Sequence, residues 1–112
     1  MKAAIDQIAA KMGTGKNVVF TGAGISTESG IPDYRSQGGI WDEFKPVYFD
    51  AFMSEKNARI EYWRQKAAMY DDLQKAKPNA AHLALAEIYD HGRLAAVITQ
   101  NIDGLHQESG IP

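Results

Sequence analysis

The apolar residues at the start of the chain recur with helical spacing. Ile5, Ile8 and Met12 fall on one side of a helix, and a Gly-Thr-Gly sequence follows them directly. Because glycine commonly ends helices, we predict an amphipathic helix over residues 2–12.

Two short runs further along the chain lack helical periodicity and are rich in β-branched residues. They are NVVF at residues 17–20 and LAAVITQN at residues 94–101, and glycine or polar residues follow each. Their length and composition predict two buried strands.

The segment between these runs begins irregularly and then becomes helical in pattern. Residues 30–39 contain a proline and three glycines, which predicts a long loop. Residues 46–73 are rich in aromatic residues and helix formers, so we predict two helices broken around Ser54–Asn57. We expect the aromatic side chains to serve core and helix packing.

Residues 77–92 predict a further helix that leads into the second strand. Asn79 is a suitable N-cap residue, and Gly92 stands at the C-terminus of the pattern. The buried stripe of this helix is predicted to consist of Leu83, Ala86 (or Leu85) and Ile88.

The order helix, strand, loop, helices, strand predicts an α/β fold. A strand that returns through a helical crossover pairs in parallel with the first strand. Open parallel sheets normally have more than two strands and are covered on both faces. We therefore expect residues 1–112 to be the first part of a larger domain, and we expect the exposed strand edges to favour dimerisation or strand swapping.

Composition excludes several classes of function. The net charge of −2 gives no electrostatic reason to expect nucleic acid or an anionic membrane as a partner. No apolar run approaches the roughly 20 residues that span a bilayer. The absence of cysteine excludes thiolate metal ligands and disulfides within these residues, and, with no signal-peptide core at the start, it favours a cytoplasmic location.

A glycine turn follows the first predicted strand. Gly22-Ala23-Gly24 lets the backbone approach a ligand closely, and a helical turn over residues 25–29 would direct N–H groups at a phosphate. Thr27, however, stands where a dehydrogenase fingerprint has its third glycine, and residues 38–43 hold no strand ending in an acidic residue. Alone, the turn could simply end a strand.

A second polar cluster, TQNID, stands at the carboxyl end of the second predicted strand. Because parallel strands end at one rim, Gln100, Asn101 and Asp103 should face the glycine turn. The two amides suit ribose hydroxyls or a carboxamide. Alternatively, Asn101 and Asp103 form a turn that caps a helical turn around Leu105.

Other candidate residues have simpler explanations. Asp33 and Arg35 could form an exposed ion pair of little energetic value. His106 could act as a general base, but we favour a structural or surface role for it, as for His82 and His91.

Three stretches together resemble the sirtuin family of NAD-dependent protein deacylases: GAGISTESGIPDYRS at residues 22–36, the GGIW that follows, and TQNIDGLHQESGIP at residues 99–112. The resemblance implies a Rossmann-like NAD-binding domain and a small zinc-binding domain, with NAD and an acyl-lysine protein or peptide meeting between them. In the family the catalytic His-Gly pair and the zinc-binding cysteines come later than this chain reaches. The resemblance thus implies that the complete protein binds zinc, that residues 1–112 do not, and that these residues alone are inactive.

The resemblance also assigns roles to individual residues. Asn101 and Asp103 are assigned to catalysis, within a nicotinamide pocket that also includes Ile102. The glycine turn and Thr27 would line the pyrophosphate and ribose, and Tyr34 stands where the family usually has phenylalanine. The full set of implied cofactor-binding residues is Gly22, Ala23, Gly24, Thr27, Asp33, Tyr34, Arg35, Gln100, Asn101, Ile102 and Asp103.

The resemblance bears on the acyl group as well. The subgroup that removes acidic acyl chains carries a Tyr-x-x-Arg pair, whereas Tyr62 is followed three residues later by Gln65, with Arg64 one place early. This difference favours acetyl-lysine over succinyl- or malonyl-lysine. Two alternatives to deacetylation stay open: ADP-ribosyl transfer from the same nicotinamide-releasing pocket, and a non-catalytic NAD-binding module.

Overall fold

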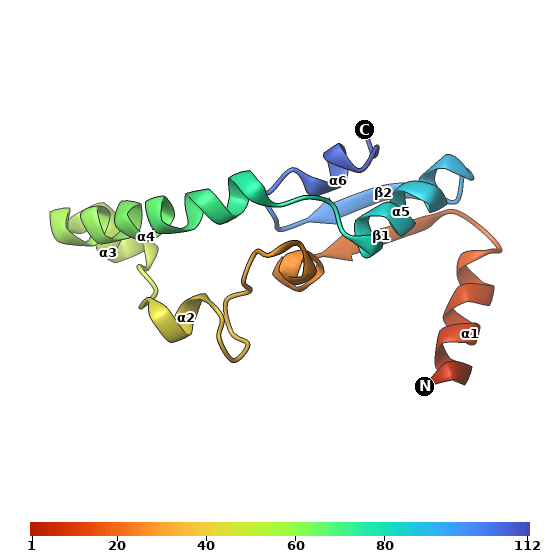
Figure 1. Ribbon diagram of the computed structural model, residues 1–112, viewed down its shortest axis with the longest axis horizontal. Helices are drawn as coiled ribbons and strands as arrows, with labels where there is room; N and C mark the ends of the chain where they lie inside the picture. The colour runs from red at the N-terminus through yellow and green to blue at the C-terminus, as the bar shows by residue number, and fades with distance from the viewer.

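Two parallel strands, β1 (Asn17–Thr21) and β2 (Leu94–Thr99), lie at the centre of the structure, a computed structural model that describes all 112 residues (Figure 1). Val19 pairs with Val97 and Thr21 pairs with Thr99, so both strands end at the same rim of the sheet. The predicted strands, their parallel pairing and the α/β class are confirmed.

Six α-helices and one 3₁₀ helix complete the fold. The predicted helix at residues 2–12, the break near Ser54–Asn57 and the helix before β2 are all confirmed. The helix at residues 40–43 was not predicted, because a single turn is too short to show a helical period. The helices are α1 (Lys2–Met12), η1 (Ala23–Ser29, the 3₁₀ helix), α2 (Ile40–Glu43), α3 (Phe49–Ser54), α4 (Lys56–Lys75), α5 (Ala80–Asp90) and α6 (Leu105–Glu108).

Helix α5 begins as its sequence predicts. The Asn79 side chain accepts the N–H of Ala81 at 2.9 Å, and His82 Nδ1 accepts the N–H of Asn79 at 3.2 Å, which forms a capping box. The Asn79 amide also donates to the carbonyl of Ile25 at 2.7 Å. One N-cap residue therefore starts α5 and attaches η1 to it.

The buried face of α5 is shifted from the predicted stripe. His82, Leu85 and Ala86 are buried, whereas Leu83 is 54% exposed. The prediction was wrong for Leu83 because the apolar pattern left out a histidine that lies at the centre of the buried face.

The larger of two small buried clusters packs against one side of the sheet. Leu85 and Ala86 of α5 pack with Leu94 and Ile111, and Val19 and Val97 join them. Side chains alternate between the faces of a strand, so the other face carries the neighbours of these valines. There Val18 is 61% exposed, Phe20 65% and Ile98 52%. The prediction that both strands are buried is therefore wrong for the open face, since no helix covers it.

The helices at the two ends of the molecule are largely solvated. Helix α1 has no buried residue, and α4 extends away from the sheet beside α3 (Figure 1). Trp63 and Tyr70 of α4 are 62% and 57% exposed, so the expectation of core packing is wrong for them. The expected packing between helices is found where Phe52 of α3 meets Tyr62 of α4, with ring centroids 5.1 Å apart. The radius of gyration is 17.2 Å, against about 13 Å for a compact chain of 100 residues. None of the helices is both long and apolar enough to cross a membrane.

Candidate functional site at the carboxyl ends of the strands

Two cavities lie side by side where β1 and β2 end, and four residues line both of them. The first cavity, of about 290 Å³, is lined entirely by residues predicted from the sequence. They are Ala23, Gly24, Asp33, Tyr34, Arg35, Gln100 and Asn101.

The second cavity, also of about 290 Å³, contains the remaining predicted residues of the second polar cluster. It shares Ala23, Tyr34, Gln100 and Asn101 with the first cavity and adds Ile102 and Asp103. Ser26, whose hydroxyl the sequence offered as a donor beside the glycine turn, also lines it. The sequence interpretation did not assign the residues that complete its wall: Ile31, Pro32, Tyr62, Lys66, Met69 and Leu73.

Helix α4 supplies four of these unassigned residues, and their spacing carried a signal. Positions 62, 66, 69 and 73 lie on one face of a helix. The stripe mixes an aromatic, a cation and two apolar residues, so a search for a purely apolar face does not single it out.

Asn101 connects the two polar clusters directly. Its side-chain amide donates to the carbonyl of Gly22 at 2.9 Å and lies 3.4 Å from the Ser26 hydroxyl. Its backbone N–H donates to Thr99 Oγ1 at 3.1 Å. The end of β2 is therefore joined to the turn that follows β1.

Asp103 makes a second connection. One carboxylate oxygen accepts the hydroxyl of Ser26 at 2.6 Å, and the other accepts the N–H of Leu105 at 3.0 Å. Asp103 therefore serves the start of α6, as the turn interpretation expected, and also lines the second cavity. Ile102, which stands between Asn101 and Asp103 in the sequence, is 85% exposed.

Asp33 organises its own loop. Its carboxylate accepts the N–H of Ser36 at 3.0 Å and contacts the Ser36 hydroxyl, and its carbonyl accepts the N–H of Ile40 at 2.7 Å. A Cβ at Gly39 would lie 2.6 Å from that carbonyl oxygen, so only glycine fits there. The two ion pairs in the molecule, Arg64–Glu61 and Lys77–Glu108, do not include Arg35, so the suggested Asp33–Arg35 pair is not formed.

Thr27 lies apart from the two cavities. Its hydroxyl donates to the carbonyl of Gly24 at 3.0 Å, and the side chain lines a separate hollow over the Asp33 loop. Tyr34 is held beside Trp41, with ring centroids 5.1 Å apart, and lines both cavities.

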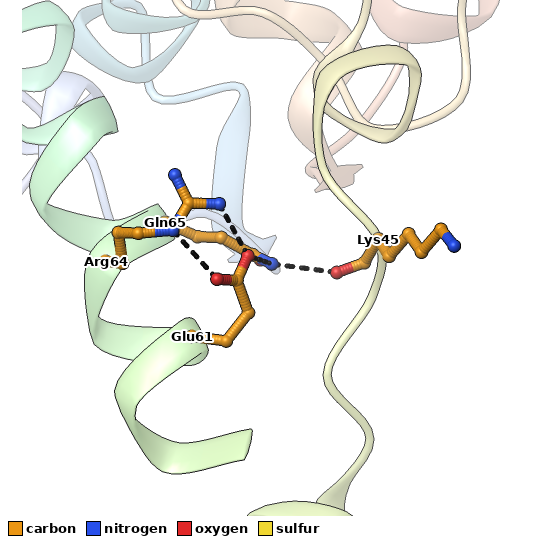
Figure 2. Close-up of polar contacts among 4 residues, drawn as sticks. All are labelled: Lys45, Glu61, Arg64 and Gln65. Carbon is orange, nitrogen blue, oxygen red and sulfur yellow. Dashed lines mark hydrogen bonds and ion pairs between the residues drawn. The ribbon is translucent and has the colours of Figure 1, made fainter. Parts of the chain in front are cut away.

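A charged cluster on α4 explains why Gln65 does not face the site (Figure 2). Gln65 Nε2 donates to the carbonyl of Lys45 and to Glu61, each at 2.8 Å. The hydrogen bond from Arg64, and then that from Gln65, lowers the pKa of the exposed Glu61 to about 2. The side chain that lines the second cavity next to Tyr62 is Lys66, which has no carboxylate partner.

The histidines lie outside both cavities. His82 and His106 are buried beneath the rim, and the exposed His91 has Nδ1 2.8 Å from the carbonyl of Glu87. No three of the His, Asp and Glu side chains are grouped as they would be around a metal ion.

A parallel strand pair with a glycine turn after the first strand and amide side chains after the second is the arrangement of a Rossmann-like α/β unit. The profile of the Sir2 family matches residues 22–112, and the chain belongs to that family. The resemblance inferred from the sequence is thereby confirmed.

Curated relatives are similar over most of this chain. An NAD-dependent protein deacetylase of Rhodopseudomonas palustris is 56% identical over 93 residues, which are 83% of this chain and 37% of that protein. NAD-dependent protein deacetylase 1 of Bradyrhizobium diazoefficiens is 48% identical over 98% of this chain and 44% of its own length. This chain thus spans less than half the length of these relatives.

Solved structures agree in fold. One from a study of the mechanism and regulation of Sir2 enzymes superposes with a TM-score of 0.86 at 41% identity, covering all of this chain and 44% of that one. A Sir2 structure with a p53 peptide and NAD⁺ gives a TM-score of 0.78 at 37% identity, covering 95% of this chain and 42% of that one.

Proposed function

We propose that the complete protein is an NAD-dependent protein lysine deacetylase and that residues 1–112 form the N-terminal part of its catalytic domain, carrying much of the NAD site. The observation that carries this proposal is the hydrogen bond from Asn101 to Gly22, which joins clusters 79 residues apart around two adjoining cavities. The relatives named as NAD-dependent protein deacetylases support it.

The first cavity fits the polar half of NAD. Arg35 has no ion pair within the chain and can face a phosphate, where a guanidinium binds well. The amides of Gln100 and Asn101 offer both donors and acceptors to ribose hydroxyls and to a carboxamide. In the proposed reaction NAD supplies the ADP-ribosyl group that accepts the acyl group as nicotinamide leaves.

The second cavity fits the reacting end. Asn101 and Asp103 are held in place by Gly22, Ser26 and Leu105, so they present fixed amide and carboxylate groups there. Ile102 offers an apolar surface at the mouth. We propose that these residues bind the nicotinamide portion and exclude water from it.

We propose that the catalytic base and the acyl-lysine groove are supplied by the remainder of the full-length protein. The share of the relatives' length that this chain spans supports that division. The 112-residue chain is accordingly expected to bind without turnover, and NAD-dependent deacetylation by it would contradict the proposal.

For the acyl group we propose acetyl, in keeping with the names of the relatives. One observation favours a chain that ends in a carboxylate instead: Lys66, which lies over the Tyr62 ring at 5.2 Å and has no carboxylate partner, lines the second cavity. Turnover of acetylated and succinylated peptides by the full-length protein distinguishes the two, and mass analysis of the acceptor reveals ADP-ribosyl transfer if that is the reaction.

Calorimetric titration of NAD into the full-length protein tests the site. Asn101→Ala and Asp103→Ala are each expected to weaken binding by about tenfold or more, because each removes charged or amide hydrogen bonds worth roughly 1–3 kcal/mol. Asn57→Ala and Asp6→Ala, at exposed positions that line neither cavity, are the matched controls. Unchanged affinity in both site variants would remove the basis for the proposed pocket.

A further inference from the structure

A network of polar side chains runs from the buried His106 and Thr21 to the exposed Thr99 and on to Asn101. His106 is 4% exposed and its Nε2 lies 2.8 Å from Thr21 Oγ1. Thr21 Oγ1 lies 2.9 Å from Thr99 Oγ1, which accepts the backbone N–H of Asn101. The side chains of His106, Thr21 and Thr99 line neither of these two cavities, and Thr99 and His106 line a separate cavity of about 280 Å³ beside β2. Their effect on the proposed NAD site therefore passes through Asn101.

The hydrogen bonds of this polar network have a preferred direction of donation. If the Thr99 hydroxyl donated to Thr21, then Thr21 would donate to His106 Nε2 and the ring proton would sit on Nδ1. That nitrogen is buried without a partner, and an unpaired buried N–H is rarer than an unpaired acceptor. His106 Nε2–H therefore donates to Thr21, and Thr21 donates to Thr99.

His82 extends the polar network toward α5 and η1. Its Nδ1 accepts the N–H of Asn79, so the neutral ring carries its proton on Nε2, which is buried and unpaired. The two rings meet edge to face with centroids 5.1 Å apart. The unpaired nitrogens of the two rings make no hydrogen bond, so His82 and His106 meet through ring packing alone.

The same polar network contacts both sides of the site, namely the turn after β1 and the end of β2. Asn79 donates to the Ile25 carbonyl at 2.7 Å and to the Ser29 hydroxyl at 3.0 Å, which fixes η1. At the other end Thr99 holds the backbone of Asn101. The polar network thus sets the position of the turn after β1 relative to the end of β2.

We propose that His106 and Thr21, acting through Thr99, are positioning residues that orient Asn101 so that its amide reaches Gly22 and faces the cavities. The inference rests on the proposed function in that it takes Asn101 to contact NAD. The structural part of the inference is that the threonine hydroxyls hold Asn101 in place. This part does not depend on which ligand binds.

The test compares Thr21→Val, Thr99→Val and Thr21→Ser in the full-length protein. Valine has the shape of threonine without the hydroxyl, whereas serine keeps the hydroxyl and loses a methyl group. Thr14→Val, at an exposed position where the hydroxyl bonds only the Lys11 carbonyl, is the control. The measurements are hydrogen exchange of the Asn101 backbone amide, kcat and KM for NAD, and the midpoint of thermal unfolding.

Loss of a hydroxyl from this network should speed exchange at Asn101 and lower kcat/KM for NAD by about tenfold in both valine variants. Thr21→Ser should keep both values within about twofold of the wild type, whatever its thermal midpoint, because the hydrogen bond is retained. Thr14→Val should change neither.

Three results would overturn the inference. Unchanged exchange at Asn101 in the valine variants shows that the hydroxyls do not hold it. Equal loss in Thr21→Ser and Thr21→Val shows that packing and not hydrogen bonding matters. Faster exchange with unchanged NAD kinetics shows that holding Asn101 is irrelevant to the ligand. A wild type that neither binds nor consumes NAD contradicts the proposed function, and the exchange data then decide the structural half separately.

Discussion

At the scale of single residues, Gly24 is the position where the lack of a side chain most directly preserves the volume of the first cavity. Its φ angle is not in the left-handed region, and a Cβ built on it meets no atom within 4 Å. Neither backbone conformation nor packing within the chain therefore requires glycine there. The residue lines the first cavity, so a side chain would project into the volume proposed for NAD.

We expect Gly24→Val to fold with a thermal midpoint close to that of the wild type and to bind NAD at least about tenfold more weakly, a loss of about 1.4 kcal/mol from filling the cavity. Calorimetry with NAD and a thermal scan measure the two effects. Gly15→Val is the control, since a Cβ there also meets nothing within 4 Å but the residue lies before β1. Full NAD affinity in Gly24→Val would show that the cavity does not hold the cofactor.

The residues of the site were predictable where chemistry is dense in sequence. The glycine turn and Gln100, Asn101 and Asp103 stand together at strand ends, and the structure places all of them except Gly22 in the lining of one or both cavities. Gly22 lines neither cavity and accepts the Asn101 amide instead. Lys66 could not be found in this way, because its presence in the site depends on where α4 crosses the rim. The hydrogen bond between Ser26 and Asp103 likewise joins residues that no local pattern relates.

At the scale of elements, α5 is a helix whose buried face contains a titratable ring. Burial lowers the pKa of His82 below its ordinary value of 6.5, the charge of His106 adds to this, and Asp103 partly opposes it. In the unfolded chain the ring regains its ordinary pKa. The unfolded state therefore binds more protons just below pH 6.5, and the free energy of unfolding falls as the pH drops through that range.

Urea unfolding of the full-length protein at pH 7.5 and pH 5 should show this loss. His82→Gln keeps an acceptor for the N–H of Asn79 and removes the titration, so its stability should depend less on pH. His91→Gln, at an exposed turn, should keep the dependence of the wild type. A pH dependence in His82→Gln equal to that of the wild type would contradict the assignment to His82.

The elements themselves followed from the sequence more closely than their burial did. Strand and helix positions depend on local periodicity and on caps such as Asn79, which the sequence displays. Whether Phe20 or Trp63 is covered depends on what packs against β1 and α4, and periodicity does not contain that information. The same apolar pattern is compatible with a covered or an open face.

At the scale of the whole molecule, the sheet carries an apolar face that nothing in residues 1–112 covers. Val18, Phe20 and Ile98 form it, next to two free strand edges. Such surfaces promote association of chains.

The isolated 112-residue chain is expected to self-associate in light-scattering measurements as its concentration rises, and Phe20→Lys should suppress this by placing a charge on the open face. Met53→Lys introduces the same charge on α3, away from the sheet, and should leave association unchanged. Equal suppression by both variants would locate the contact elsewhere or attribute it to net charge.

The small core also determines how the chain responds to temperature. Only 15 of 112 residues are buried, so unfolding hydrates little additional apolar surface. The heat-capacity change of unfolding should consequently be well below the usual value of roughly 12–15 cal/mol/K per residue, which gives a flat stability curve. Conversely, any surface that covers the open face of the sheet should bind with a large negative heat-capacity change. Much of the heat-capacity change that normally accompanies the folding of a domain would then accompany the binding of that surface.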